Sequence, residues 1–292
     1  HENAFLKMSE FMKKDISVVM SGEGADELFA GYGRIFRSPH DYYMSKNPIF
    51  GKLINYSSNK ETRKKNLSPM EHFLSRYSWF SHGEQQDFLN KDFLNNSSDT
   101  YSNEYIGSLF QKVSHLNYYE AMYYLLGKLH LTNLLNRLDR MTMAASIEAR
   151  VPFLDVKLVE FVSKMPIHYK LRWKNKISSI TSKFLNSETI SEKYDIPKYI
   201  LKKLAEQKIP NSIIYRKKMG FPVPLNNWVG KKLGEYAYDI FTSTDSKSKH
   251  IFDLTILKKF IKKGSFDAKE DLDGKKIWMM LNIELWLQDK KF

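Results

Sequence analysis

The chain has 292 residues, enough to bury a substantial core in one large domain or two small ones. It contains no cysteine, which excludes disulfides, thiolate metal sites and cysteine nucleophiles. The 46 basic and 33 acidic residues give a net charge of +13. This excess favours an anionic partner such as a nucleotide, a nucleic acid, a phosphorylated metabolite or an acidic lipid, and lysine-rich helix faces that are merely solvated explain it equally well.

No apolar run approaches the roughly 20 residues of a membrane span, and the first residues lack the pattern of a secretory signal. We therefore expect a cytoplasmic protein. The first helix is predicted from apolar residues at helical spacing: Phe5, Met8, Phe11 and Met12. The run "ISVVM" (16–20) then predicts a strand covered on both faces, as in a parallel sheet.

A parallel strand needs neighbours, and almost nothing else in the chain has strand character. We therefore expect a segment upstream of this chain to supply the rest of the sheet. Residues 41–70 are polar and broken, which predicts a surface excursion. The fold class predicted is α/β and predominantly helical.

From about residue 70 the pattern is helical almost to the end. Helices are predicted over 69–80, 118–143, 155–165, 198–210, 257–264 and 274–288. Asp155 has the position of a helix N-cap, and Pro210 is expected to stop the helix before it. Residues 242–250 are typical of a polar linker, and the sequence shows neither an internal repeat nor a second domain boundary.

The stretch "VVMSGEGADELFAGYGR" (18–34) places four glycines and three acids directly behind the predicted strand. Backbone N–H groups beside a helix N-terminus form an anion site, and small residues let a phosphate or carboxylate come close. Asp26 and Glu27 suit Mg²⁺, and Glu23 is placed to take or relay a proton. A turn with a well-charged helix start explains the same acids without any function, and both interpretations stay open here.

A second stretch, "NRLDRMTMAASIEARVPFLD" (136–155), mixes charges with small and apolar residues. These charges are Arg137, Asp139, Arg140, Glu148, Arg150 and Asp155. Partial burial is expected, so they should be paired with each other or bound to a ligand. Structural ion pairing and catalysis explain the pattern about equally well, and Arg150 has more the character of a structural corner.

The third stretch, "IYRKKMGFPVPLNNWV" (214–229), places three cations before a loop that glycine and proline constrain. A lysine that such a loop brings to a phosphate would stabilise charge developing during phosphoryl or nucleotidyl transfer. The alternative is a solvated basic face.

Together and in this order, the three stretches resemble the C-terminal synthetase domain of glutamine-hydrolysing asparagine synthetases. "KYILKK" (198–203) and "GKKIWMMLNIELWL" (274–287) are similar to that family too. The resemblance covers nearly the whole chain and is weakest over 41–115. It implies the C-terminal part of an adenine-nucleotide alpha-hydrolase-like (ATP pyrophosphatase-type) synthetase domain, with only part of its parallel sheet present.

The resemblance also implies a chemistry that uses ATP and Mg²⁺. The side-chain carboxylate of aspartate is adenylated with release of pyrophosphate, and ammonia from glutamine attacks β-aspartyl-AMP to give asparagine. Nucleotide contacts are implied for Ser21, Gly22 and Gly24, and Asp26 would bind Mg²⁺. Glu23 would lie by the intermediate and deprotonate the attacking ammonia. Lys218 would hold the departing phosphate charge. The pocket lining implied by the resemblance is Arg137, Asp139 and Arg140.

Two features of that family are missing from this sequence: a glutaminase domain with a nucleophilic cysteine, and the Ser-Gly-Gly-x-Asp-Ser loop that grips pyrophosphate. We therefore expect residues 1–292 to be a partial synthetase domain that cannot turn over alone. A homodimer stays open, and neither a nucleic-acid nor a membrane partner is expected.

Other amide ligases of the same superfamily are the nearest alternative. β-Lactam synthetases and related enzymes of antibiotic or surface-polysaccharide pathways share the scaffold and act on another acid. Glu23 favours asparagine synthesis, because the β-lactam enzymes resemble this stretch but place a tyrosine there. A basic helical module that binds nucleic acid is a more distant alternative, and it leaves the acidic glycine-rich loop unexplained.

Overall fold

The computed structural model describes residues 2–47, 67–97, 100–218, 223–230, 232–266 and 271–289. The chain divides into two compact units, one made of residues 1–76 and 105–219 and the other of residues 77–104 and 220–292. The sequence shows no sign of this boundary, because both units are helical and the second is assembled from two separate segments. Among the described residues, no helix has the length and apolar character needed to cross a membrane.

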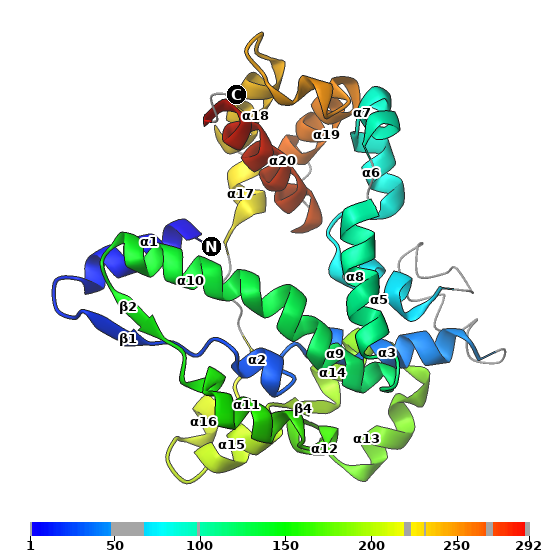
Figure 1. The fold of residues 1–292 in the computed structure, drawn as a ribbon, viewed down its shortest axis with the longest axis vertical. Helices are drawn as coiled ribbons and strands as arrows, with labels where there is room; N and C mark the ends of the chain where they lie inside the picture. The colour runs from blue at the N-terminus through cyan, green and yellow to red at the C-terminus, as the bar shows by residue number, and fades with distance from the viewer. Residues whose placement is uncertain are drawn as a thin grey trace. The chain divides into compact units, whose positions relative to one another are not determined.

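The first unit contains two pairs of short strands among its helices (Figure 1). β1 (Val18–Met20) pairs in parallel with β2 (Glu148–Arg150), and β3 (Leu171–Trp173) pairs antiparallel with β4 (Asp195–Pro197). The helices and helical turns wholly or largely in this unit are α1 (Glu2–Met12), α2 (Ala25–Leu28), α3 (Gly33–Ser45), α5 (Pro69–Tyr77), α8 (Thr100–Lys112), α9 (Tyr118–Leu126), the π-helical turn η1 (Gly127–Leu131), α10 (Thr132–Ala144), η2 (Pro152–Leu154), α11 (Val156–Ser163), α12 (Ile167–Lys170), α13 (Lys176–Thr181), η3 (Ser182–Phe184), α14 (Ser187–Lys193), α15 (Tyr199–Ala205) and α16 (Asn211–Ile214).

The strand predicted over 16–20 is confirmed as β1, but its surroundings are not as expected. Val18 and Met20 are exposed, so the prediction that both faces are covered is wrong. Within the described ranges β1 has β2 as its neighbour, and this neighbour belongs to the chain itself. That an upstream segment supplies further strands stays a prediction. β2 carries the sequence Glu-Ala-Arg, which has no β-branched or aromatic residue. Because pairing with β1 rather than residue type defines this strand, the sequence pattern missed it.

Most of the predicted helices are confirmed, with differences at their ends. The helix predicted over 118–143 is α9, η1 and α10 in succession, and Asp155 caps α11 by accepting a hydrogen bond from the N–H of Leu158. The helix at 198–210 ends at Ala205, before Pro210, which instead caps α16; Pro210 is therefore not its stop signal.

The surface excursion predicted over 41–70 is wrong at both of its described ends. α3 continues to Ser45 with Asp41 and Tyr42 buried, because Asp41 accepts hydrogen bonds from the backbone N–H and the hydroxyl of Ser187. α5 already begins at Pro69. Residues 48–66 lie outside the described residues.

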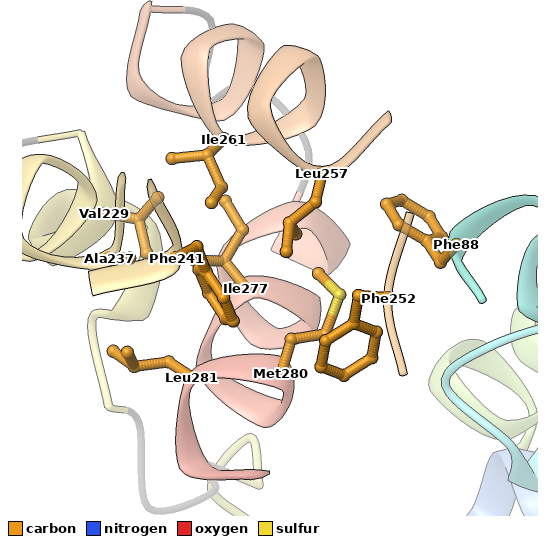
Figure 2. Close-up of a cluster of buried hydrophobic side chains, with 10 residues drawn as sticks. All are labelled: Phe88, Val229, Ala237, Phe241, Phe252, Leu257, Ile261, Ile277, Met280 and Leu281. Atoms are coloured by element: carbon orange, nitrogen blue, oxygen red, sulfur yellow. The ribbon is translucent and has the colours of Figure 1, made fainter. Parts of the chain in front are cut away.

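The second unit packs its helices around one apolar cluster, shown in Figure 2. Its elements are α6 (His82–Phe88), α7 (Lys91–Asn96), α17 (Leu225–Val229), α18 (Lys232–Thr242), η4 (Ser248–His250), α19 (Leu254–Phe266) and α20 (Asp271–Asp289). The predicted helices at 257–264 and 274–288 are confirmed as α19 and α20. Leu257 and Ile261 of α19 meet Ile277 and Leu281 of α20 in the cluster, all four buried.

The predicted polar linker at 242–250 does connect two helices, but it is partly buried. The carboxylate of Glu284 is fully buried and accepts hydrogen bonds from the hydroxyls of Ser246 and Ser248 and from the backbone N–H groups of Lys247 and Ser248. These bonds hold the loop against α20, so this polar composition serves packing rather than solvation.

Candidate functional site

The turn after β1 contains one glycine with open space beside it and one that is closely packed. Gly22 is exposed, and a Cβ added to it would meet no described atom within 4 Å. Gly24 has φ +90°, and an added Cβ would lie 2.4 Å from Leu154 Cδ2 in η2. Gly24 therefore lets the second sequence motif pack on the first, whereas Gly22 leaves room beside the main chain.

The expected helix N-terminus is much weaker than the sequence indicated. α2 has only 4 residues, and the N–H groups near its start bond within the turn: Glu23 to the Ser21 hydroxyl at 3.3 Å and Ala25 to the Gly22 carbonyl at 3.4 Å. A single helical turn adds little dipole, so a helix N-terminus does not account for an anion site here. Ser21 fixes the turn through this hydroxyl.

Asp26 lies between two lysines. Its Oδ1 atom is 2.9 Å from Nζ of Lys198 and 2.9 Å from Nζ of Lys218. Lys218 also donates a hydrogen bond to the Gly31 carbonyl at 3.2 Å and lies over the ring of Tyr32, 4.7 Å from its centroid. Burial raises the pKa of Asp26, but the two ammonium groups outweigh burial and leave that pKa below its ordinary value.

This cluster depends on Gly31, one of the four glycines in the first motif. A Cβ on Gly31 would lie 1.6 Å from Oδ1 of Asp26 and 2.5 Å from Cε of Lys198. Any side chain at residue 31 therefore displaces the carboxylate or the lysine. The glycine makes room for two neighbouring side chains of the protein itself.

Lys198 was missed as a site residue although "KYILKK" was noted. It immediately precedes α15 and has φ 54° and ψ 37°, a left-handed conformation that non-glycine residues seldom adopt. Its backbone N–H donates to the Phe29 carbonyl at 3.0 Å, which fixes this lysine to the segment after α2. No sequence signal distinguishes it from neighbouring surface lysines, because its role depends on a contact distant in sequence.

Lys218 does reach the acidic turn, as the family resemblance led us to expect. The residues that were expected to hold it, Met219 to Phe221 of the Gly-Phe-Pro loop, lie outside the described residues. Its ammonium group points at Asp26 rather than into solvent, although the side chain is half-exposed. Arg216 and Lys217 are exposed in the same stretch.

Glu27 has different surroundings from Asp26. It is buried and accepts a hydrogen bond of 2.7 Å from the hydroxyl of Tyr32, so its carboxylate is engaged inside the fold. The ring of His130, on η1, packs edge-on against Tyr32 at 5.2 Å between centroids. Burial lowers the pKa of His130, so the cationic form of this histidine is disfavoured beside Tyr32. The interpretation of Glu27 as a Mg²⁺ ligand beside Asp26 stays a prediction, and in this structure its carboxylate binds the Tyr32 hydroxyl.

Glu23 is held by Arg137 of α10. Nη2 of Arg137 lies 3.2 Å from Oε1 of Glu23, and both side chains are four-fifths buried. The guanidinium also lies 5.1 Å from the ring centroid of Phe5, on α1, which Figure 1 shows alongside α10. Its Nε atom is buried with no hydrogen-bond partner among the described residues. Partial burial of this arginine was expected and is confirmed.

Other charges of the second motif stay out of this arrangement. Asp139 and Arg140 are exposed on α10, so the expected partial burial is wrong for both. Glu148 and Arg150 are exposed on β2 and pair with each other at 2.8 Å. Helical periodicity explains the exposure of Asp139, which is two residues from Arg137 and so lies on another side of α10. Arg140, three residues from Arg137, has the spacing of a shared face, and it is nevertheless exposed.

Chemically, the arrangement offers two cations and one carboxylate next to open backbone. The two lysines suit an anion such as a phosphate, and the carboxylate suits a divalent cation bound between that anion and Asp26. Among the described residues, no group of three or more histidine, aspartate or glutamate side chains could hold a metal ion without other ligands.

Comparison with known proteins agrees with the sequence motifs. The family model described as "Asparagine synthase" matches residues 3–288. Asparagine synthetase [glutamine-hydrolyzing] 1 of Bacillus subtilis is 27% identical over 292 residues, covering 94% of this chain and 40% of that protein. A putative asparagine synthetase [glutamine-hydrolyzing] of Mycobacterium tuberculosis is 26% identical, with 94% of this chain and 39% of that protein covered. The chain thus spans about 40% of the length of these relatives.

Proposed function

Because the chain belongs to the asparagine synthase family, we propose that it is the part of an ATP-dependent amide ligase that handles pyrophosphate and the activated acid. In this reaction a side-chain carboxylate oxygen of aspartate attacks the α-phosphorus of ATP, and the bond to the β-phosphate breaks. Ammonia derived from glutamine then attacks the acyl carbon of β-aspartyl-AMP, AMP leaves, and the nitrogen loses a proton. The observation that carries the proposal is the placement of Asp26 between Lys198 and Lys218, close in sequence to the open backbone at Gly22.

The two lysines form the proposed pyrophosphate contact. Both ammonium groups lie on the same oxygen of Asp26, so the three side chains together carry one net positive charge. The two lysines share a single oxygen of Asp26, whereas a phosphate would offer each of them an oxygen of its own. Charge-assisted hydrogen bonds from lysine to phosphate are strong. The lysines would then stabilise the charge that develops as pyrophosphate leaves.

Asp26 is the proposed protein ligand for Mg²⁺. The residues fit this ion, because Mg²⁺ commonly takes one or two protein carboxylates and fills its other positions with water and substrate phosphate. When bound, Mg²⁺ supplies neutralisation of the phosphate charges. The two lysines would turn from Asp26 to the phosphate, and this would free the Asp26 carboxylate to act as a ligand.

Glu23 is the proposed acceptor of the proton that the attacking nitrogen loses. Arg137 fixes the direction of its carboxylate through the 3.2 Å contact, and the Ser21 hydroxyl fixes its backbone. A base must be held within reach of the proton that it takes, and these two contacts supply the restraint.

Binding of inorganic pyrophosphate, measured by isothermal titration calorimetry with and without Mg²⁺, tests the proposal. Lys198→Gln and Lys218→Gln should each weaken binding roughly tenfold or more, since each removes a charge-assisted hydrogen bond. Asp26→Asn should strengthen metal-free binding, because it frees both lysines, and should abolish the gain that Mg²⁺ brings.

The matched control is Lys203→Gln, which removes an exposed cation of α15 that pairs with Glu206. It should leave pyrophosphate affinity unchanged. Equal binding by the wild type, Lys198→Gln and Lys218→Gln would refute the proposed site. The identity of the substrate acid is tested by measuring pyrophosphate release from ATP by a full-length protein, with aspartate and with other carboxylic acids. Release with another acid and not with aspartate would indicate a related ligase.

A further inference from the structure

One segment of the first unit carries cations and large apolar side chains, and its own residues include no acid. Residues 171–187, from β3 to the start of α14, contain Arg172, Lys174, Lys176 and Lys183 and neither aspartate nor glutamate. On α13 and η3, Ile177, Ile180 and Phe184 are 70%, 62% and 53% exposed.

The polarity of this segment is inverted relative to an ordinary surface helix. Ser178 and Ser182 point inward and are buried; Ser178 bonds to the Asn175 side chain, and Ser182 donates to the Ser178 carbonyl. Ile177 and Ile180 point outward instead. A surface helix normally turns its apolar stripe to the core, so packing within the first unit does not account for the outward apolar row.

The cations border this apolar row. Ile177, Ile180 and Phe184 are spaced by three and four residues, which places them on one side of the helical segment. Lys176 and Lys183 each precede a member of this row in sequence and are exposed. Long lysine side chains can keep their ammonium groups in water while their stems lie along an apolar layer.

Exposed apolar residues alone would not identify a partner, as α11 shows. Val156 and Phe161 on α11 are 68% and 66% exposed, comparable to the residues on α13. The charges around them include both signs, with Glu160 and Lys157 on the same helix. What sets the α13–η3 face apart is that its own charges are all positive, and this charge selects an anionic partner. Glu188, the exposed acid that follows the segment on α14, is paired with Arg34 at 3.8 Å.

We propose that the α13–η3 face, made of Lys176, Ile177, Ile180, Lys183 and Phe184, binds the surface of a membrane that contains anionic lipid. Projecting apolar side chains enter the boundary between headgroups and acyl chains, and the flanking lysines meet the lipid phosphates. A fluid surface accepts a short projecting row without a groove of matching shape. This is peripheral binding, distinct from spanning, and it departs from the sequence-based expectation of no membrane partner. It is independent of the proposed ligase activity.

Co-sedimentation with vesicles tests the proposal. The chain should sediment with vesicles of phosphatidylcholine and phosphatidylglycerol, should not sediment with phosphatidylcholine alone, and should be released by salt. Ile177→Ser with Ile180→Ser should abolish sedimentation. Lys176→Gln with Lys183→Gln keeps the apolar row and should weaken binding roughly fivefold per lysine.

The matched control is Val156→Ser with Phe161→Ser, which removes two apolar side chains of comparable exposed fraction from α11 and should not change sedimentation. Circular dichroism of each variant shows that the fold is kept. Equal binding to both kinds of vesicle, or no effect of either α13–η3 variant, overturns the proposal. So does self-association in analytical ultracentrifugation that Ile177→Ser with Ile180→Ser abolishes, because the face would then join copies of the chain.

Discussion

The acidic turn of the first unit and the core of the second unit hold their carboxylates in opposite ways. Glu284 is fully buried, and its oxygens accept hydrogen bonds from neutral groups of Ser246, Lys247, Ser248 and Gln288. Those donors fill its lone pairs. Asp26 instead shares one oxygen between the flexible ammonium groups of two lysines from separate segments.

The difference separates a structural group from one suited to binding. Burial opposes ionisation of Glu284, but the hydrogen bonds to Ser248 and Lys247 prevail and lower its pKa. This is a fixed arrangement with no acceptor left for a ligand. The lysines on Asp26 can turn to an incoming anion, and Gly22 leaves open backbone in the same turn. The buried carboxylate of Glu284, with all its acceptor positions filled, thus stabilises the second unit. The two lysines that share one oxygen of Asp26 leave the turn of the first unit able to bind an anion.

The largest effect is expected in the core of the second unit. Leu281→Ala should lower the free energy of unfolding by about 2–5 kcal/mol, because Leu281 is fully buried and the change leaves a cavity. Ile283→Ala, at an exposed position of the same helix, should cost far less. Urea unfolding measures both. Pyrophosphate affinity should survive Leu281→Ala at low urea; its loss would break the comparison, because the site would then depend on the second unit.

Acid should weaken the first unit through His72. Burial lowers the pKa of His72 to about 4 from 6.5, so the unfolded chain takes up this proton first as the pH falls. Stability is retained above about pH 6.5 and should decrease by about 3 kcal/mol as the pH falls to about 4. Urea unfolding midpoints measured across this range should depend less on pH in His72→Gln than in the wild type. His168→Gln, at an exposed position, should keep the pH dependence of the wild type. An unchanged slope in His72→Gln would contradict this assignment.

The two carboxylates themselves give the next effect. Glu284→Gln should destabilise the chain by about 1.5–3 kcal/mol, since hydrogen bonds to a charged buried group are lost or weakened. Asp26→Asn should cost less than about 1 kcal/mol in stability, because its partners are partly exposed, while it changes pyrophosphate binding. Thermal unfolding and calorimetry separate the two effects. Equal destabilisation by both changes would show that Asp26 is structural as well.

The last comparison distinguishes the glycines of the turn, and it includes the smallest expected change in stability. Gly31→Ala should lower stability by about 1–3 kcal/mol and disrupt pyrophosphate binding, because the new methyl group collides with Asp26 and Lys198. Gly22→Ala meets open space, so stability should change by less than about 0.5 kcal/mol. If ligand approaches this backbone as proposed, Gly22→Ala still weakens binding. Unfolding and titration of both variants decide which glycine serves which role.

Sequence patterns predicted the helices better than the site. Apolar spacing located α1, α19 and α20, and Asp155 was recognised as an N-cap, because these features depend on residues within one or two helical turns. The contact of Lys218 with the acidic turn was anticipated from the family resemblance rather than from spacing. β2, with the sequence Glu-Ala-Arg, had no local signal.

By itself, the sequence determined where most helices form and, through its short motifs, the family to which the chain belongs. Tertiary structure alone decided that Lys198 joins Lys218 on Asp26, that Glu27 turns inward to Tyr32, and that Gly24 and Gly31 serve packing. The physical reason is range. Helix periodicity and capping are set by neighbours in the chain, whereas shared ion pairs and close approaches join segments far apart in sequence, whose meeting no local pattern records.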